Sequence, residues 1–273
     1  ITTQDCLGVL RSIEKRGSLE QGKRTLGVIS QILDYATALG FCTYNPATSL
    51  NRHAPIKQTV EHFPCISWQE FPELLQAMES NPGGADPMTL GGLELLMLCF
   101  MRTTELIAAD WNEINWEAKV WTIPAERMKG KRGSRKEHLV PLSNQALKVL
   151  ESIKGITGPD GMIFKSIRTK SGYISNNTLN MALKRMGFDN RMCGHGFRTL
   201  ALTNIQEHLK IDLRIVDRQL AHIEKNKVTA AYNRAEYWDE RVDMMQKWAE
   251  LVDEKKSKQK KEAQSPPVTD FMR

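Results

Sequence analysis

The chain has 273 residues, of which 38 are Lys or Arg and 32 are Asp or Glu, so its formal net charge at pH 7 is +6. With 41% hydrophobic and 26% charged residues it can bury a sizeable core, which excludes a wholly disordered protein and suits one large or two modest domains. The longest apolar run, residues 93–101, is interrupted by Glu94 and is too short to cross a bilayer, so we expect no membrane protein.

The first residues of the chain and its cysteines indicate the cellular compartment in which we expect the protein. The chain begins with Ile1 instead of Met, and no charged segment followed by an apolar one opens it, so we expect a fragment without a secretory signal. The 5 cysteines are an odd number at wide intervals and include no Cys-x-x-Cys pair. This pattern favours a reduced, cytoplasmic protein over a disulfide framework or a zinc knuckle.

The first predicted domain, residues 1–56, is helical. Within residues 24–39 the apolar side chains recur at spacings of three and four, which predicts a helix with one apolar face made of Leu26, Ile29, Ile32, Leu33, Ala36 and Leu39. Asn45 and Pro46 end this pattern. The stretch that follows is polar and contains two prolines, and it predicts a linker at residues 57–63.

The second predicted domain, residues 64–255, opens with a helix and contains a central buried one. Ser67-Trp68-Gln69-Glu70 fits a capping box ahead of an apolar helical pattern. Residues 90–109 are rich in Leu and Met, which predicts a single buried helix after a loop at residues 81–87. Arg102 and Glu105 are spaced three apart near its end, so both should project from one side.

A change of hydrophobic period from residue 111 predicts a small sheet. Apolar residues alternate around Ile114 and Trp116, and residues 120–123 and 139–142 form two further β-rich runs. Between the last two runs lies a predicted basic hairpin loop whose cations are Arg127, Lys129, Lys131, Arg132, Arg135 and Lys136. Helical patterns resume at residues 143–153, 175–186, 196–209, 213–220 and 237–252, and a lysine-rich tail, residues 256–273, is expected to be mobile.

Four features of this pattern could carry chemistry. They are Arg102 with Glu105, the basic hairpin, His195 with Arg198, and His222 followed ten residues later by Tyr232. Taken singly, each feature is weak evidence. Arg102 and Glu105 could form a structural ion pair, a basic loop is more often a solvated turn, His195 and Arg198 could be surface polar groups, and a tyrosine by default contributes to packing. Their combination in one chain is more informative, because together they contain the groups that phosphodiester cleavage requires.

A phosphodiester under attack places extra charge on its nonbridging oxygens, which two guanidiniums such as Arg102 and Arg198 can bind in a bidentate manner. Lys129 or His195 could protonate the leaving oxygen, and the phenol of Tyr232 could form a covalent phosphoester. The sequence has no G-x-x-x-x-G-K-[ST] loop and no cluster of acidic residues for two magnesium ions. It therefore implies neither ATP nor a metal, and we expect no cofactor.

These residues are arranged as in a known family. The chain resembles the tyrosine recombinases, specifically the phage, prophage and genomic-island integrases that insert elements at transfer RNA genes. The resemblance lies in Arg102-Thr103-Thr104-Glu105-Leu106, in the hairpin from Ile123 to Ser143, in His195-Gly196-Phe197-Arg198, in Leu220-Ala221-His222 and in Ala231-Tyr232-Asn233-Arg234. It implies a mainly α fold: a helical core-binding domain followed by a catalytic domain with a small three-stranded antiparallel sheet.

The resemblance also implies roles for individual residues. Tyr232 would attack the scissile phosphate to form a 3′-phosphotyrosyl link, and Arg102, Arg198 and His222 would stabilise the phosphate. Lys129 would protonate the leaving oxygen, although Lys131 could take its place if the hairpin register shifted. His195 would assist as acid or base, Glu105 would orient the arginines, and DNA contacts would come from Arg127, Lys131, Arg132, Arg135 and Lys136.

The partners implied are duplex DNA at core attachment sites, three further copies of the chain in a homotetramer, and an accessory DNA-bending protein and an excisionase. Residues 237–252 could pass to a neighbouring subunit or pack in their own chain. Two other functions remain open at this stage. One is a type IB topoisomerase-like cleavage and resealing of one strand, and the other is a catalytically silent DNA-binding regulator of the same fold.

Overall fold

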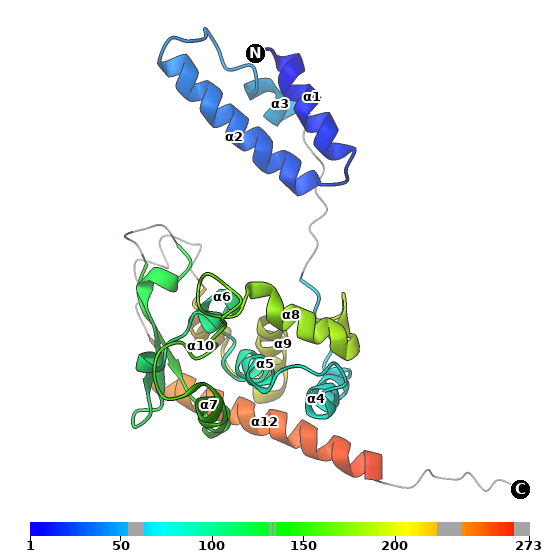
Figure 1. Ribbon diagram of the computed structural model, residues 1–273, viewed down its shortest axis with the longest axis vertical. Helices are drawn as coiled ribbons and strands as arrows, with labels where there is room; N and C mark the ends of the chain where they lie inside the picture. The colour runs from blue at the N-terminus through cyan, green and yellow to red at the C-terminus, as the bar shows by residue number, and fades with distance from the viewer. Residues whose placement is uncertain (54–62, 131–132, 134, 223–235, 265–273) are drawn as a thin grey trace, which may run out of the picture. The chain divides into compact units, whose positions relative to one another are not determined.

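The computed structural model describes residues 1–53, 63–130, 133, 135–222 and 236–264, and the chain divides into two units, residues 1–62 and 63–273 (Figure 1). The division falls at the end of the linker predicted at residues 57–63, most of which lies outside the described residues. Each unit has a hydrophobic core of its own.

Unit 1 consists of α1 (Thr3–Glu14), α2 (Leu19–Ala38) and α3 (Thr48–His53), with α1 packed against the other two. Its core is formed by Cys6, Leu10, Leu26, Leu33, Ala47 and Leu50. Leu26 and Leu33 are buried as the helical pattern predicts, whereas Ile32 and Leu39 from the same predicted face are exposed. The stripe of α2 that this small unit covers is therefore narrower than the apolar face of the sequence.

Unit 2 is built around α5 (Pro87–Cys99), which lies among the other helices of the unit (Figure 1). This helix is apolar on all sides, and Leu93, Leu95 and Leu96 are completely buried. A Cβ atom on Gly91 would lie 2.8 Å from Cδ1 of Ile153, so the glycine allows α5 and α7 (Asn144–Thr157) to approach closely. The prediction of a buried central helix is confirmed for residues 87–99.

The sheet of unit 2 has three antiparallel strands in the order β1 (Ile114–Asn115), β2 (Val120–Ile123) and β3 (His138–Pro141). Trp121 lies opposite Ile114 on one side and Val140 on the other, and its side chain is completely buried. These strands confirm the predicted three-stranded sheet, and the basic loop is the connection between β2 and β3.

Unit 2 contains nine further short elements among the described residues. They are α4 (Phe71–Ser80), α6 (Thr103–Ile107), η1 (Trp111–Glu113), η2 (Ala125–Arg127), α8 (Asn176–Leu183), η3 (Lys184–Phe188), α9 (Gly196–Asn204), η4 (Ile205–Leu209) and α10 (Leu213–Gln219). Of these, α6, α8 and α9 contact α5. The mainly α fold with a small antiparallel sheet is therefore confirmed.

The helix α12 (Trp238–Gln264) runs across one side of unit 2 and contacts β3, α10, α7, α5 and α4 (Figure 1). Trp248 is completely buried and its Nε1–H donates to the carbonyl of Met97 at 3.0 Å, so the helix packs within its own chain. It also continues past residue 255, where we predicted the domain to end. Residues 256–264 of the predicted tail are therefore helical, because Lys, Glu and Gln are good helix formers despite their charge.

Candidate active site

The helical backbone is interrupted directly after α5, and this interruption sets the position of Arg102. We predicted one helix over residues 90–109, but Phe100 has a left-handed backbone (φ 55°) and α6 starts only at Thr103. Phe100 is completely buried and its ring meets that of Trp248 edge-on at 5.8 Å, so tertiary packing stabilises the break. The prediction failed because the apolar character of the sequence continues through the break.

Arg102 lies at the start of α6 and is held by Glu105. The backbone N–H of Arg102 donates to Oε2 of Glu105 at 2.9 Å, and its Nη1 donates to Oε1 at 2.5 Å. The Glu105 side chain is 2% exposed and that of Arg102 is 19% exposed. Nη2 of Arg102 donates to the carbonyl of Ala221 at 3.2 Å. Glu105 therefore fixes the guanidinium of Arg102, as the spacing predicted.

Arg198 is the most deeply buried of the five predicted catalytic residues that the structure describes. It lies on α9 and is 4% exposed, with Nη1 donating to the carbonyl of Phe100 at 2.5 Å and Nη2 donating to that of Leu220 at 2.7 Å. Burial, followed by the positive charge of Arg102, lowers the pKa of Arg198 to about 10. The side chain is nonetheless charged at neutral pH, so the structure buries a guanidinium next to a second one.

The segment after α10 supplies two of the three carbonyl acceptors, those of Leu220 and Ala221, together with His222. Ala221 has a left-handed backbone (φ 48°), which lets the chain turn directly after Leu220. His222 is exposed, and its Nδ1 lies 2.8 Å from Oδ1 of Asp217. Because Asp217 occupies Nδ1, Nε2 is the ring nitrogen that can meet a ligand.

His195 lies immediately before α9 and in the field of several cations. Burial lowers its pKa below the usual value, and so do the positive charges of Arg198, Arg102, His222 and Lys129. Its ring is 4.4 Å from that of Phe63, centre to centre. The pKa shift keeps His195 neutral near pH 7, so it can accept a proton there. Five of the six predicted catalytic side chains thus gather around one place, while Tyr232 lies outside the described residues.

The basic hairpin is only partly described, because Lys131 and Arg132 fall outside the described residues. Lys129 and Lys136 are exposed. Arg135 donates from Nε to the carbonyl of Gly130 at 2.8 Å and from Nη1 to that of Glu126 at 2.9 Å. It therefore ties the two sides of the loop together.

Arg127 differs from the other cations of the hairpin. Its Nη1 and Nη2 donate to the two carboxylate oxygens of Glu113 at 2.5 and 2.6 Å, and Nη1 also donates to the carbonyl of Ala108. Only 17% of its side chain is exposed. We expected Arg127 to face DNA, but its guanidinium anchors the start of the hairpin to residues 108–113 because an acidic partner lies in reach.

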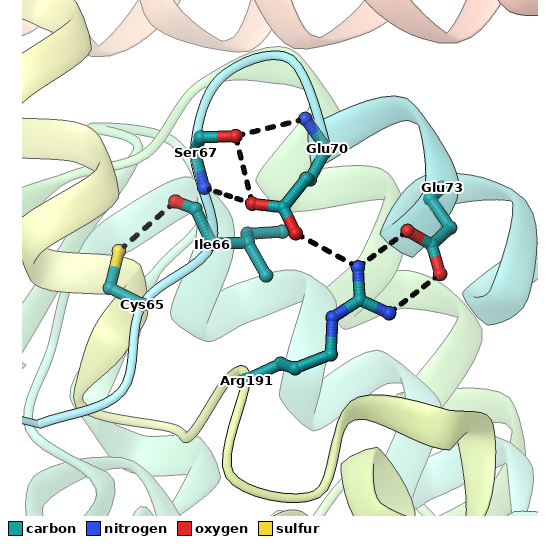
Figure 2. A network of polar contacts seen from close by, with 6 residues as sticks. All are labelled: Cys65, Ile66, Ser67, Glu70, Glu73 and Arg191. Atoms are coloured by element: carbon teal, nitrogen blue, oxygen red, sulfur yellow. Dashed lines mark hydrogen bonds and ion pairs between the residues drawn. The ribbon is translucent and has the colours of Figure 1, made fainter.

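A cluster that the sequence analysis missed fixes the loop before His195 (Figure 2). Arg191 donates to both carboxylate oxygens of Glu73 at 2.8 and 2.6 Å and to Oε1 of Glu70 at 3.0 Å (Figure 2). Glu70 also accepts from the backbone N–H of Ser67 at 2.9 Å, as the predicted capping box requires. The Glu70 side was visible in the sequence, but Arg191 is 118 residues from Glu73 and has no local signal.

The segment from Phe63 to Ser67 lies directly against the start of α9. A Cβ atom on Gly196 would come within 2.5 Å of the Pro64 carbonyl oxygen, and Sγ of Cys65 donates to the Gly196 carbonyl at 3.3 Å. The first residues of unit 2 are therefore packed against Gly196, which follows His195 and is the first residue of the helix that carries Arg198.

The arrangement suits an anion with several oxygen atoms. The site brings together five positive or hydrogen-bonding side chains, those of Arg102, Lys129, His195, Arg198 and His222. Glu105 is the carboxylate that holds Arg102 among them. The part of the chain that the structure describes has no group of three or more His, Cys, Asp or Glu side chains that could hold a metal ion. No described helix combines the length and apolar character needed to span a membrane.

Comparison with known proteins identifies relatives of both units. Residues 65–238 match the Phage integrase family, and residues 1–53 match the Phage integrase central domain. The protein IntB of Escherichia coli (strain K12) is 38% identical over 264 residues, which are 93% of this chain and 66% of IntB. The integrase of Enterobacteria phage P4 is 34% identical over 269 residues, which are 94% of this chain and 61% of that protein.

The chain therefore spans slightly under two thirds of the length of these curated relatives. Among solved structures, a lambda integrase tetramer bound to a Holliday junction aligns with a TM-score of 0.63 and 19% identity, covering 86% of this chain and 65% of that one. At this low identity the similarity shows that the two chains share a fold.

Proposed function

Because the chain belongs to the phage integrase family, we propose that it forms the core-binding and catalytic parts of a site-specific DNA recombinase. It cuts and rejoins duplex DNA through a 3′-phosphotyrosyl intermediate and so integrates or excises a prophage or genomic island. The core-binding domain is residues 1–56, and the catalytic domain starts at residue 64 and includes α12.

The observation that carries this proposal is the pair of fixed guanidiniums. Arg198 is held by the carbonyls of Phe100 and Leu220, and Arg102 by Glu105 and the carbonyl of Ala221. A guanidinium has five N–H donors, so each keeps several for a ligand, and Nε of Arg198 has no described partner. Such preorganised donors stabilise the charge that develops on a phosphate under attack.

In the proposed reaction Tyr232 attacks the phosphorus, and the 5′-oxygen of the cut strand leaves. The tyrosine forms a new P–O bond as the bond to the 5′-oxygen breaks, so the number of phosphoester bonds is unchanged and no ATP is needed. Lys129 gives a proton to the leaving oxygen. His222 donates from Nε2 to a nonbridging oxygen, and neutral His195 accepts the phenolic proton.

The free 5′-hydroxyl then attacks the phosphotyrosyl bond of a partner strand, which releases Tyr232. Recombination of two duplexes needs four such cleavages, so we propose a homotetramer on core-type DNA sites. A lambda integrase tetramer bound to a Holliday junction supports this assembly as a precedent within the fold. An accessory DNA-bending protein, an excisionase, transfer RNA gene targets and action in the bacterial cytoplasm belong to the same proposal.

The DNA contacts of the hairpin come from Lys131, Arg132 and Lys136, with Arg135 shaping the loop. Arg127 is left out of this set because Glu113 already engages both of its Nη atoms. Lys129 remains the proposed catalytic lysine, with Lys131 as the alternative.

The test is incubation with a nicked suicide duplex that carries the core site from the junctions of the element encoding the chain. We expect a covalent adduct that resists denaturant and is absent in Tyr232→Phe. Arg198→Ala should slow adduct formation on the order of 10²-fold or more while it changes site binding far less. A wild-type chain that binds the site and forms no adduct would instead be a silent DNA-binding regulator.

A further inference from the structure

A buried polar network outside the predicted site connects α12 with the segments that hold the two arginines. Its centre is Gln219, the last residue of α10, which is 2% exposed. Nε2 of Gln219 donates to the carbonyl of Cys99 at 3.3 Å. Its Oε1 accepts from Nε of Arg241 at 3.0 Å and from Nη2 of Arg241 at 2.8 Å.

Arg241 comes from the first turn of α12 and is 1% exposed. Besides Gln219, its Nη2 donates to the carbonyl of Leu139 on β3. The described hydrogen bonds of its guanidinium all go to neutral acceptors. Burial lowers the pKa of Arg241 to about 10, and the nearby charge of Arg218 lowers it further while that of Glu236 raises it. A buried charge without an acidic partner is costly, and neutral hydrogen-bond acceptors offset that cost only when they are well placed.

His138 completes the network on the sheet side. It is 5% exposed, and its Nε2 lies 3.0 Å from the backbone carbonyl oxygen of Gln219. Burial lowers the pKa of His138 to about 3, so the ring is neutral and Nε2–H donates to that carbonyl. Gln219 is therefore fixed through its backbone by β3 and through its side chain by α12 and α5.

The position of Gln219 in the chain gives this network its importance. Cys99, which accepts from Gln219, is followed directly by Phe100, and Gln219 itself is followed by Leu220 and Ala221. The carbonyls of these three following residues are the acceptors that hold Arg198 and Arg102. Gln219 thus joins the two segments whose carbonyls hold the guanidiniums.

We propose that Arg241 is a positioning residue for strand cleavage, which acts by holding Gln219 and through it the carbonyls that orient Arg198 and Arg102. The inference rests on the proposed function. Arg241 also follows Tyr232 by nine residues, and its backbone N–H donates to the carbonyl of Tyr237 at 2.9 Å. Docking of the helix after the nucleophile and placement of the arginines therefore depend on the same side chain.

The test measures single-turnover adduct formation on the suicide duplex at saturating DNA, together with the dissociation constant for the site and the melting temperature. Arg241→Met should slow adduct formation by at least about tenfold, because a small displacement of a catalytic group is expensive. Site binding should change by less than about threefold, since the Arg241 side chain is 1% exposed and cannot itself contact DNA. Gln219→Leu should reproduce this pattern.

The matched control is Val252→Ala, which shortens a buried apolar side chain further along α12 and leaves the Gln219 network and the Phe100 contact intact. It should lower the melting temperature while adduct formation stays within about twofold of wild type. Combining Arg241→Met with Arg198→Lys gives a second readout. If Arg241 acts partly through Arg198, the loss in the double variant should be clearly smaller than the product of the two single losses.

Three results would overturn the proposal. They are wild-type cleavage by a folded Arg241→Met chain, losses that multiply in the double variant, and slowing in Val252→Ala equal to that in Arg241→Met. If Arg241→Met does not fold, Arg241→Lys and Gln219→Leu carry the same expectation. A wild-type chain that binds the site without forming an adduct contradicts the proposed function itself, whereas wild-type adducts with unimpaired Arg241 variants contradict only the positioning role.

Discussion

At the level of single residues, Arg198 combines deep burial with a full positive charge. Its guanidinium is compensated by the carbonyls of Phe100 and Leu220 and not by a carboxylate. A carboxylate in direct contact would neutralise the charge that a phosphate is to meet, whereas carbonyl dipoles orient the group and leave its charge available. Glu105 contacts Arg102 instead, so one carboxylate organises a site that remains positive overall.

His138 provides a residue-level prediction about stability and pH. Its folded pKa of about 3 lies below the unfolded value of about 6.5, so the unfolded state binds a proton first as the pH falls. The contribution of neutral His138 is complete above pH 6.5 and decreases below it by about 1.4 kcal/mol per pH unit until the pH approaches 3.

Urea unfolding at pH 7.5 and pH 5, followed by tryptophan fluorescence, measures this effect in unit 2, because all 6 tryptophans lie after residue 62. The wild-type chain should lose about 2 kcal/mol more than His138→Gln between these two values. Equal losses in the two proteins would show that His138 is not held neutral in the folded state.

The side chains of the site could be predicted from the sequence, but what holds them could not. His195, Arg198 and Arg102 occur in recognisable local motifs. Their acceptors are backbone carbonyls, which every residue has, and Gln219 and Arg241 meet only after the chain has folded. The ion pair of Arg127 with Glu113 could not be predicted either, since nothing near Arg127 in the chain indicates Glu113 as its partner.

At the level of elements, the start of α9 is fixed by close packing. Gly196 separates His195 from the rest of the helix, and a methyl group there would press on the carbonyl oxygen of Pro64. The neighbouring atom belongs to the backbone, so it cannot turn aside as a flexible side chain could. Any substitution must move either the segment after the linker or the first turn of α9.

We therefore predict that Gly196→Ala destabilises unit 2 by about 1–3 kcal/mol and slows adduct formation, since His195 and Arg198 flank the displaced turn. The control is Gly155→Ala. Gly155 is an exposed residue of α7 where an added Cβ atom would have open space within 4 Å, so alanine there should stabilise by about 0.5–1 kcal/mol. Denaturant unfolding measures the stability of the two variants, and adduct formation on the suicide duplex measures their cleavage rates. Gly196→Ala with wild-type stability would refute the packing argument.

Hydrophobic periodicity predicted the elements well and their interruptions poorly. The sheet, the basic hairpin and the helices around α5 follow from period and turn residues. The break at Phe100 does not, because it depends on packing against Trp248 from a distant part of the chain. The length of α12 was underestimated because a run of charges resembles a solvated tail even when its residues favour a helix.

At the level of the whole molecule, the net charge of +6 matters through its distribution. Several cations are already paired, such as Arg127 with Glu113 and Arg191 with Glu70 and Glu73. These pairs contribute to structure and are poor candidates for DNA contacts. Better candidates for DNA contacts are the other cations of the basic hairpin, of which Lys136 is exposed in the described part of the chain.

This distribution predicts the salt dependence of binding. Changing Lys131, Arg132 and Lys136 together to alanine should reduce the slope of log K against log[salt] by about 0.9 for each phosphate that is no longer neutralised, so by about 2–3 in total. Lys247→Ala, which removes a cation paired with Asp243 on α12, is the control and should leave the slope unchanged. Titrations on the core duplex at several salt concentrations measure it, and an unaltered slope in the triple variant would exclude these phosphate contacts.

Covalent attachment of DNA to Tyr232 is the step on which the whole proposed reaction depends. Peptide mapping of the covalent adduct by mass spectrometry, after nuclease and protease digestion, locates the attachment. We expect a nucleotide on the peptide that contains Tyr232, linked through a 3′-phosphate, and no adduct from Tyr232→Phe. A nucleotide on another residue, or on a 5′-phosphate, would exclude Tyr232 as the proposed nucleophile.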